Sequence, residues 1–448
     1  MKKLFGTDGI RGVAGEFPLD EGTVFTIGRS LARLSQERLG RKPRFVTGRD
    51  TRESGGWIER AFHAGAIAGG AECLSSGVIT TPGVAYVTGY GDFDGGIVIS
   101  ASHNPYEDNG IKIFNPSGKK ARESTEAAIE ADVDATNEPV HLIDDAVVDA
   151  SRSAEFRSAY LGHLAEAFVG LDLSRFSITV DCANGAASDL APELFRRFRA
   201  SVDAIHDKPD GKNINEDCGS LHLQHLQKRV VEMKTDLGVA FDGDADRALF
   251  VDGSGEIADG DAVLWIMAKY LSDHGRLLNK KVVATVMSNL GLEVALNAEG
   301  IEMVRTDVGD KYVLAELISG GAEIGGEQSG HIIFPEKSLV GDGMLTALYL
   351  LQAISETGRS LSEAAAGFVR YPQTLVNVKV KEKRPFDEVP AIREAVLATE
   401  RSLTGTGRLL LRYSGTENLA RVMMEGKDQA MIDGLAESLA DIIQQELG

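Results

Sequence analysis

Short apolar runs alternate with helical patterns along the whole chain. Runs typical of buried strands occupy residues 96–100, 176–180, 237–241 and 282–286, with helical patterns between them. This alternation predicts an α/β protein whose sheets are mostly parallel and buried between helices. A chain of 448 residues has room for about three such domains, and four also fit.

Changes in composition divide the chain into four units. A polar, acidic stretch at 124–149 ends the first unit, and a turn at 252–255 ends the second. The last unit opens with an alternating strand at 375–380 and ends in an amphipathic helix. We therefore expect four domains, at 1–150, 151–255, 256–369 and 370–448.

The net charge limits the partners of this chain. With 47 Lys and Arg against 67 Asp and Glu, the formal charge is −20, and such a surface repels nucleic acid and anionic lipid. We therefore expect neither nucleic acid nor a membrane as partner. An anionic substrate would also be repelled unless cations gather locally, so the sequence predicts a positive pocket in an acidic protein.

The cysteines and the apolar runs indicate a cytoplasmic protein. Cys73, Cys182 and Cys218 are odd in number and lack metal-like spacing, which is typical of reduced thiols. Residues 1–12 contain lysines but no apolar core of a signal peptide. No apolar run approaches the roughly 18 residues that a membrane helix needs.

Four polar, glycine-rich loops each follow an apolar strand-like run, one in each unit. In open α/β sheets, ligands bind outside the carboxyl ends of the strands. We therefore expect the four loops to meet at one cleft. We name them the serine loop (100–109), the acidic loop (242–247), the glutamate loop (325–331) and the arginine loop (412–418).

The acidic loop places three carboxylates, of Asp242, Asp244 and Asp246, at a strand end. Two like charges about 4 Å apart repel by about 4 kcal/mol at an effective dielectric constant of about 20, and a bound cation is the simplest relief. Oxygen ligands in a partly open set suit Mg²⁺. A solvated acidic turn is the alternative. A calcium-binding hand is excluded, because Arg247 stands where that loop needs glycine and Gly253 where it needs glutamate.

The serine loop places Ser102 just after a strand, where a hydroxyl is a nucleophile if a metal and a base lower the barrier. His103 and Asn104 supply polar partners, and Pro105 stiffens the turn. Alone, such a cluster is more often an ordinary turn, so the prediction depends on the acidic triad. Lys112 could pair with a phosphate or move a proton, although a surface lysine is the default interpretation.

The glutamate loop combines a carboxylate, an amide, a hydroxyl and an imidazole, from Glu327, Gln328, Ser329 and His331. Sugar hydroxyl and amino groups need such paired donors and acceptors. The alternative is a glycine-rich connection that binds no ligand.

The arginine loop has the donors of an anion site. The hydroxyls of Ser414 and Thr416, the backbone around Gly415, and the guanidinium groups of Arg412 and Arg421 could hold a phosphate dianion. An ordinary hairpin turn is the alternative, and the excess of donors in an acidic protein favours binding.

These motifs resemble those of a known family, the α-D-phosphohexomutases, over essentially the whole chain. The resemblance implies four domains around a central cleft, three with mixed, mostly parallel α/β sheets and a smaller C-terminal α+β domain. The segments that carry it follow one another as 5–12, 101–105, 242–247, 326–331 and 412–418.

The resemblance also implies the role of each site residue. Ser102 would carry a phosphoryl group, and one Mg²⁺ per chain would be held by that group and by Asp242, Asp244 and Asp246. Arg11 and Arg247 would lie near the phosphoserine, with Lys112 and His331 as proton-transfer groups. The residues expected to bind substrate are His103, Gly309, Asp310, Glu327, Ser329, Arg412, Ser414, Gly415, Thr416 and Arg421.

Within the family, Gln328 and the Ser-Gly-Thr-Glu run at 414–417 resemble glucosamine-specific members, although Asn418 stands where many relatives have proline. The implied reaction interconverts glucosamine 6-phosphate and glucosamine 1-phosphate through glucosamine 1,6-bisphosphate, feeding amino-sugar nucleotide and cell-wall precursor synthesis. The alternatives are a mutase for mannose or glucose phosphates, a metal-dependent sugar phosphatase, and a sugar-phosphate sensor without turnover. The resemblance leaves a homodimer open.

Overall fold

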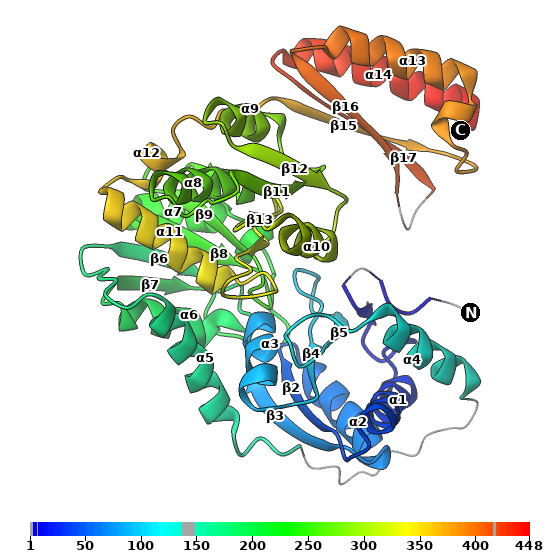
Figure 1. Ribbon diagram of the computed structural model, residues 1–448, viewed down its shortest axis with the longest axis vertical. Helices are drawn as coiled ribbons and strands as arrows, with labels where there is room; N and C mark the ends of the chain where they lie inside the picture. Colours follow the sequence, from blue (N-terminus) through cyan, green and yellow to red (C-terminus); the bar gives the residue numbers. More distant parts are fainter. Residues whose placement is uncertain (1–2, 7, 137–147, 415–417) are drawn as a thin grey trace. The chain divides into compact units, whose positions relative to one another are not determined.

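The computed structural model describes residues 3–6, 8–136, 148–414 and 418–448. The chain forms two compact units, whose helices and strands are labelled in Figure 1. The first comprises Met1–Thr285 and Thr306–Ala365, and the second Val286–Arg305 and Ala366–Gly448. No helix in the described ranges has the length and apolar character to span a bilayer.

The first sheet carries the serine loop and has the strand order β1-β5-β4-β2-β3. Its strands β2, β3 and β4 are parallel, whereas β5 and β1 are antiparallel additions at one edge. Phe45, Ile97 and Ile99 belong to the core beneath α1, α2 and α4, while Gly48 and Gly96 face α3, as the two-residue period of a strand requires. The elements are β1 (Ile10–Val13), α1 (Glu21–Leu39), β2 (Arg44–Arg49), α2 (Gly55–Ala68), β3 (Glu72–Val78), α3 (Thr81–Tyr90), β4 (Gly95–Ile99), β5 (Asp108–Phe114) and α4 (Glu123–Ala135).

The second sheet carries the acidic loop and has the order β10-β9-β8-β6-β7. Here β6, β7 and β8 are parallel, while β9 runs antiparallel to β8 and β10 antiparallel to β9. The elements are α5 (Ser153–Ala167), β6 (Ser177–Asp181), α6 (Ala187–Arg197), β7 (Ser201–Ile205), η1 (Gly219–Leu221), α7 (Gln224–Met233), β8 (Leu237–Phe241), β9 (Ala248–Asp252) and β10 (Ile257–Ala258).

The third sheet of the first unit is short and carries the glutamate loop. Strand β11 pairs with β13 in parallel, and β13 pairs with β14 in antiparallel orientation. Buried aspartates begin the two long helices, since Asp259 caps α8 through Ala262 N and Asp342 caps α11 through Leu345 N. The elements are α8 (Gly260–Asp273), β11 (Lys281–Thr285), α10 (Asp310–Gly320), β13 (Gly325–Gly326), β14 (Ile332–Ile333), α11 (Gly343–Thr357) and α12 (Leu361–Ala365).

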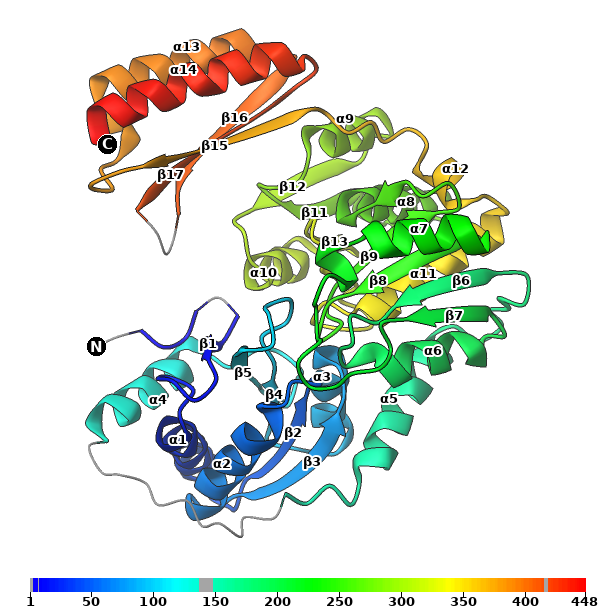
Figure 2. The same cartoon turned by 180° about the vertical axis from the view of Figure 1, so that it is seen from behind.

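The second unit is an antiparallel sheet in the order β15-β17-β16, with α13 and α14 on one face (Figure 2). Residues 286–305 belong to this unit because Arg408 donates to the carbonyls of Val286 and Ser288, and buried Glu425 accepts from Asn289. The elements are α9 (Leu290–Ala298), β12 (Glu302–Thr306), β15 (Gln373–Lys379), η2 (Phe386–Glu388), α13 (Pro390–Leu403), β16 (Gly407–Tyr413), β17 (Leu419–Gly426) and α14 (Gln429–Leu447).

The α/β class predicted from the sequence is confirmed, with mixed sheets in the first unit and a smaller sheet domain at the C-terminus. The structure adds one regularity that the strand pattern did not predict. Each of the four loops joins two neighbouring antiparallel strands: β4 to β5, β8 to β9, β13 to β14, and β16 to β17. The arginine loop therefore does connect a hairpin, and its side chains, not its position in the sheet, decide whether it binds an anion.

Candidate active site

Ser102 lies between β4 and β5 with its hydroxyl against the acidic loop. Its Oγ donates to Asp242 Oδ2 at 2.5 Å, and its backbone N donates to Ser100 Oγ at 2.9 Å. The backbone φ of Ser102 is +53°, which is uncommon for a residue other than glycine. The serine and acidic loops therefore meet as the sequence analysis expects, although Ser102 and Asp242 are 140 positions apart in the chain.

The acidic triad is buried and forms a compact oxygen cluster. One carboxylate oxygen from each of Asp242, Asp244 and Asp246 lies within 4.8 Å of the others. Burial, together with the charges of Asp246 and Asp244, raises the pKa of Asp242 well above its usual range. Oδ1 of Asp244 and Oδ1 of Asp246 are buried without a hydrogen-bond partner in the described part of the chain. Buried acceptors in this state are costly, so the cluster fits a hard divalent cation.

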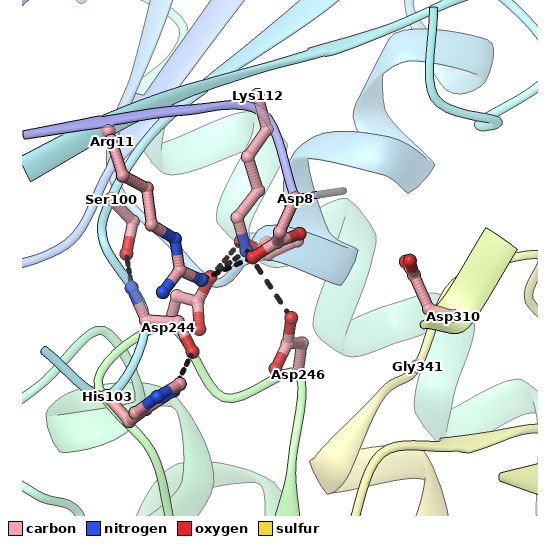
Figure 3. A network of polar contacts seen from close by, with 12 residues as sticks. Asp8, Arg11, Ser100, His103, Lys112, Asp244, Asp246, Asp310 and Gly341 are labelled. Carbon is pink, nitrogen blue, oxygen red and sulfur yellow. Dashed lines mark hydrogen bonds and ion pairs between the residues drawn. The ribbon is translucent and has the colours of Figure 1, made fainter. Parts of the chain in front are cut away.

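Lys112 points from β5 into this cluster (Figure 3). Its Nζ lies 2.9 Å from Asp244 Oδ2, 3.2 Å from Asp8 Oδ2 and 3.4 Å from Asp246 Oδ2. Burial lowers the pKa of Lys112, but the three carboxylates raise it more, so it stays well above its usual range. The default interpretation of Lys112 as a surface lysine is wrong, since the side chain is 1% exposed.

Asp8, which the sequence analysis did not single out, links the cations of the site (Figure 3). Its carboxylate accepts from Arg11 and contacts Lys112 and Lys120. Lys120 also reaches Asp310 Oδ2 at 2.8 Å. Burial raises the pKa of Asp8, but the charges of Lys112 and Lys120 lower it by more. The pKa of Asp8 therefore lies below its usual range, and the carboxylate is charged. Its position within segment 5–12 was the one available signal.

His103 and Arg247 lie together beside the serine hydroxyl. His103 Nδ1 is 3.2 Å from Ser102 Oγ and 3.1 Å from Arg247 Nη1. Burial, and then the charges of Arg247 and Arg11, lower the pKa of His103 to about 4. The imidazole is therefore neutral near pH 7 and acts as a hydrogen-bonding group, not as a cation.

The glutamate loop brings His331 to the acidic loop. His331 Nδ1 lies 3.6 Å from Asp246 Oδ1, and the backbone N of Gly341 donates to Nε2 at 3.2 Å. Burial lowers the pKa of His331, but Asp246 raises it to about 9. The bond from Gly341 N requires an Nε2 without a proton, so it belongs to the neutral ring with its proton on Nδ1. The raised pKa instead favours the charged ring, in which Nε2 carries a proton and that bond is lost. Nε2 is therefore the nitrogen at which the two forms differ.

Gly341 is a second position that the sequence analysis did not identify. A Cβ there would lie 2.5 Å from His331 Nε2, so only glycine lets the backbone approach the ring. Glu327 accepts from Gly309 N at 3.3 Å and thereby joins the glutamate loop to residues 309–310. Ser329 lies in the same turn and is partly buried.

A cavity of about 400 Å³ lies in the first unit beside these groups, within the size range of small-molecule sites. Arg11, Arg247 and His331 supply positive or protonatable groups to its wall, and Asp8, Asp246, Asp310 and Glu327 supply carboxylates. The local cations expected from the sequence are therefore present, but the wall is of mixed charge and the prediction of a positive pocket is not confirmed. The predicted site residues in its lining are Arg11, His103, Asp246, Arg247, Gly309, Asp310, Glu327 and His331.

In the second unit, Arg412 and Arg421 are directly paired across β16 and β17. Like charges in this position destabilise a sheet, and burial together with Arg421 lowers the pKa of Arg412. Arg421 Nη2 donates to Ser414 Oγ at 3.4 Å, and Lys383 Nζ donates to the Ser414 carbonyl at 2.7 Å. A bound anion would relieve this concentration of positive charge. Gly415 and Thr416 lie outside the described residues.

A second cluster of metal-ligating types, Asp181, His206 and Cys218, has a structural explanation. Within the described ranges its ligand atoms, like those of the triad, all lie within 4.8 Å of one another. Asp181 Oδ1, however, accepts from Ala183 N, and Asp181 Oδ2 accepts from Gly219 N at 3.1 Å and lies 3.1 Å from His206 Nδ1. Both carboxylate oxygens are used to hold the loop, so the acidic triad is the better cation site.

Comparisons with known proteins agree with this geometry. Four family models match consecutive parts of the chain: phosphoglucomutase/phosphomannomutase domain I at 2–139, domain II at 158–255, domain III at 259–371 and the C-terminal domain at 375–442. A protein of Solibacter usitatus named phosphoglucosamine mutase is 48% identical over 100% of this chain and 99% of its own length.

Solved structures share the fold at low sequence identity. A phosphoglucomutase/phosphomannomutase family protein of Burkholderia thailandensis has a TM-score of 0.79 at 22% identity, covering 99% of this chain and 98% of its own. The N-acetylphosphoglucosamine mutase of Aspergillus fumigatus, solved with GlcNAc-6P and magnesium, has a TM-score of 0.66 at 19% identity, covering 99% and 95%. With every domain model matched in order and a relative this similar over its whole length, the chain belongs to the phosphoglucomutase/phosphomannomutase family, and it is an intramolecular phosphotransferase of the isomerase class.

Proposed function

We propose that this chain interconverts glucosamine 6-phosphate and glucosamine 1-phosphate, with Ser102 as the residue that carries the phosphoryl group. The observation that carries the proposal is the 2.5 Å contact between Ser102 Oγ and Asp242 within the acidic triad. The glucosamine preference is supported by the name of the relative that is 48% identical over the full length. The four domains proposed from the sequence would then supply the serine, acidic, glutamate and arginine loops in turn.

We propose Mg²⁺ as the cation held by Asp242, Asp244 and Asp246. Three supports are the all-oxygen donor set, the two buried oxygens without a hydrogen bond in the described residues, and the magnesium in the related fungal structure. When bound, Mg²⁺ offsets the negative charge of the transferring phosphoryl group.

The first half-reaction moves the phosphoryl group from the enzyme to the sugar. The bond from phosphorus to Ser102 Oγ breaks and a bond to O1 of glucosamine 6-phosphate forms, while the O1 proton is taken up by the enzyme and Ser102 Oγ regains one. Arg11 and Arg247 line the cavity near Ser102 and would donate to the phosphoryl oxygens. Lys112 and His331, both in contact with the acidic loop, would move the proton.

The second half-reaction reverses these bonds at the other end of the sugar. Glucosamine 1,6-bisphosphate turns so that its 6-phosphoryl group faces Ser102. Its bond to O6 breaks and a bond to Ser102 Oγ forms, while the Ser102 hydroxyl proton is taken up by the enzyme and O6 gains one. Glucosamine 1-phosphate is then released. Ring contacts would come from the turn bearing Glu327 and Ser329 and from the segment 309–310, with His103 beside the phosphoryl group.

We propose that Arg412, Ser414, Gly415, Thr416 and Arg421 bind the phosphate that is not reacting. Because the intermediate turns end for end, the same donors must accept either phosphate in turn. Flexible guanidinium and hydroxyl groups suit this task. The paired arginines on β16 and β17 support this proposal.

The proposed function is tested by substrate comparison. With Mg²⁺ and a trace of hexose 1,6-bisphosphate, kcat/KM for glucosamine 6-phosphate should exceed that for the glucose and mannose analogues by about tenfold or more. Mass analysis should find one phosphoryl group on the peptide that contains Ser102. Release of inorganic phosphate in place of the 1-phosphate would indicate a phosphatase, and a preference for mannose or glucose would replace the proposed substrate.

Replacing Arg421 with alanine should mainly weaken substrate binding. A hydrogen bond to a charged group contributes about 1.5–3 kcal/mol, so the KM for glucosamine 6-phosphate should rise about tenfold to a hundredfold. The matched control is Arg393→Ala, because Arg393 is exposed on α13 of the same unit. An Arg421→Ala variant with unaltered KM would remove this residue from the proposed phosphate site.

A further inference from the structure

The backbone of the serine loop is held by two donors that the reaction scheme above does not use. Asn215 Nδ2 donates to the carbonyl oxygens of Ser102 and Asn104, both at 2.9 Å. Arg52 Nη2 donates to the same two oxygens, at 3.2 Å and 2.5 Å. Asn215 lies in the loop between β7 and η1, and Arg52 lies in the loop after β2. Two separate parts of the chain therefore hold the same turn.

From this double attachment we propose that Asn215 and Arg52 are positioning residues that set the direction of Ser102 Oγ for phosphoryl transfer. The inference rests on the proposed function, because it assumes that Ser102 is the nucleophile. Neither residue lines the cavity, so each would act on the reaction through Ser102 and not through the substrate.

The conformation of Ser102 explains why such attachment is needed. Its φ of +53° is a conformation that residues other than glycine rarely adopt, and it persists only when surrounding contacts impose it. The two carbonyl groups flank His103, so fixing both of them fixes the orientation of the intervening turn. A phosphoryl-transfer nucleophile must be aligned closely with its partner, and a misplacement of about 1 Å can cost about a hundredfold in rate.

The acidic loop packs against the same carbonyl. A Cβ at Gly243 would lie 2.5 Å from the Ser102 carbonyl oxygen and 3.0 Å from Asn215 Nδ2. Glycine at this position therefore allows the serine loop, the acidic loop and Asn215 to meet without a gap. The same contact that orients Ser102 thus sets its distance from the carboxylates of the acidic loop.

Each donor is itself held in place. Arg52 is fully buried and paired with the carboxylate of Asp50, which is also fully buried. Asn215 has a φ of +59°, and its backbone N donates to the Ala183 carbonyl at 3.0 Å. Asp181 accepts hydrogen bonds from the backbone N of Ala183 and from that of Gly219. It therefore holds both the residue that binds Asn215 N and the chain that follows Asn215. Asp181 thereby supports the loop that presents Asn215.

The experiment compares two asparagines of one loop in the full-length, phosphorylated, Mg²⁺-loaded protein. Asn215→Asp replaces a donor by a carboxylate that repels both carbonyls, and Asn215→Ala only removes the donor. Asn213→Asp is the matched control, because Asn213 lies two positions away and its side chain bonds to Asp210 N and the Lys208 carbonyl within its own loop. Arg52→Lys keeps a charge beside Asp50 while removing the forked donor.

We expect kcat to fall about a hundredfold in Asn215→Asp and Arg52→Lys and about tenfold in Asn215→Ala, with KM within about twofold of wild type. The single-turnover rate at which hexose 1,6-bisphosphate phosphorylates Ser102 should fall in parallel, while thermal melting of Asn215→Asp stays close to that of Asn213→Asp. If Asn215→Asp keeps the kcat of Asn213→Asp, or changes only its melting temperature, the positioning role is overturned while the proposed function stands. If the wild type shows no phosphorylation of Ser102, the proposed function itself fails.

Discussion

Replacing Ser102 with alanine is expected to abolish mutase turnover, with a fall in kcat on the order of 10⁴-fold or more. The hydroxyl oxygen is the atom to which the phosphoryl group is proposed to bond, and alanine offers no atom for that bond. Ser100, the nearest serine in the loop, uses its Oγ to accept the hydrogen bond from Ser102 N, whereas the hydroxyl that contacts the acidic triad is that of Ser102, so Ser100 is not placed to take over the reaction.

The fold should survive this change. The substitution removes the hydrogen bond to the buried Asp242 Oδ2, which costs about 1–3 kcal/mol, and leaves the backbone bonds from Arg52 and Asn215 intact. Turnover of glucosamine 6-phosphate and the mass of the Ser102 peptide should be measured beside Ser124→Ala, an exposed serine on α4. Normal turnover in Ser102→Ala would refute the phosphoserine relay, whatever the identity of the sugar.

Replacing Asp244 with asparagine is expected to weaken the dependence on Mg²⁺ and the rate together. Asn keeps an oxygen that can accept from Thr81 Oγ1, which lies 2.6 Å from Asp244 Oδ2, so the acidic loop should keep its shape. It removes one negative charge from a buried triad whose proposed task is to hold a divalent ion. We expect the half-saturating Mg²⁺ concentration to rise about tenfold to a hundredfold and kcat to fall about a hundredfold to a thousandfold.

Magnesium titrations of activity and of thermal melting measure this effect separately from folding. Asp189→Asn is the control, because Asp189 is an exposed carboxylate on α6 of the same unit. The Asp244→Asn substitution also removes the negative charge nearest to Lys112. A lower rate could therefore come from Lys112, and only the magnesium titration tests the metal site. An unchanged magnesium titration would contradict the assignment of Asp244 as a ligand.

Those parts of the site that have a local sequence motif could be predicted. The acidic loop was recognised by its alternating aspartates after a strand. The serine loop was recognised by a serine followed by histidine and asparagine after another strand. The meeting of Ser102 with Asp242 followed from the general location of loops at strand ends. The direct pairing of Arg412 with Arg421 depends on strand register, which the pattern of donors around the arginine loop did not contain.

Other site residues carry little or no local mark. Asp8 was marked only by its place in segment 5–12, and Lys120 and Gly341 are ordinary residues of polar loops. Their importance comes from contacts such as the 2.8 Å pair between Lys120 and Asp310, 190 positions apart. Arg52 and Asn215 are equally inconspicuous, although they hold the same two carbonyl oxygens.

By itself, then, the sequence determined the α/β class, the order of the four loops and the chemical groups available to each, because strand periodicity and side-chain chemistry are local properties. Only the tertiary structure decided which cation neutralises which carboxylate, that Lys112 is buried, and how the turn at Ser102 is held. Most of those outcomes depend on distances of about 3 Å between residues 50 to 190 positions apart, and such distances are set by the path of the whole chain.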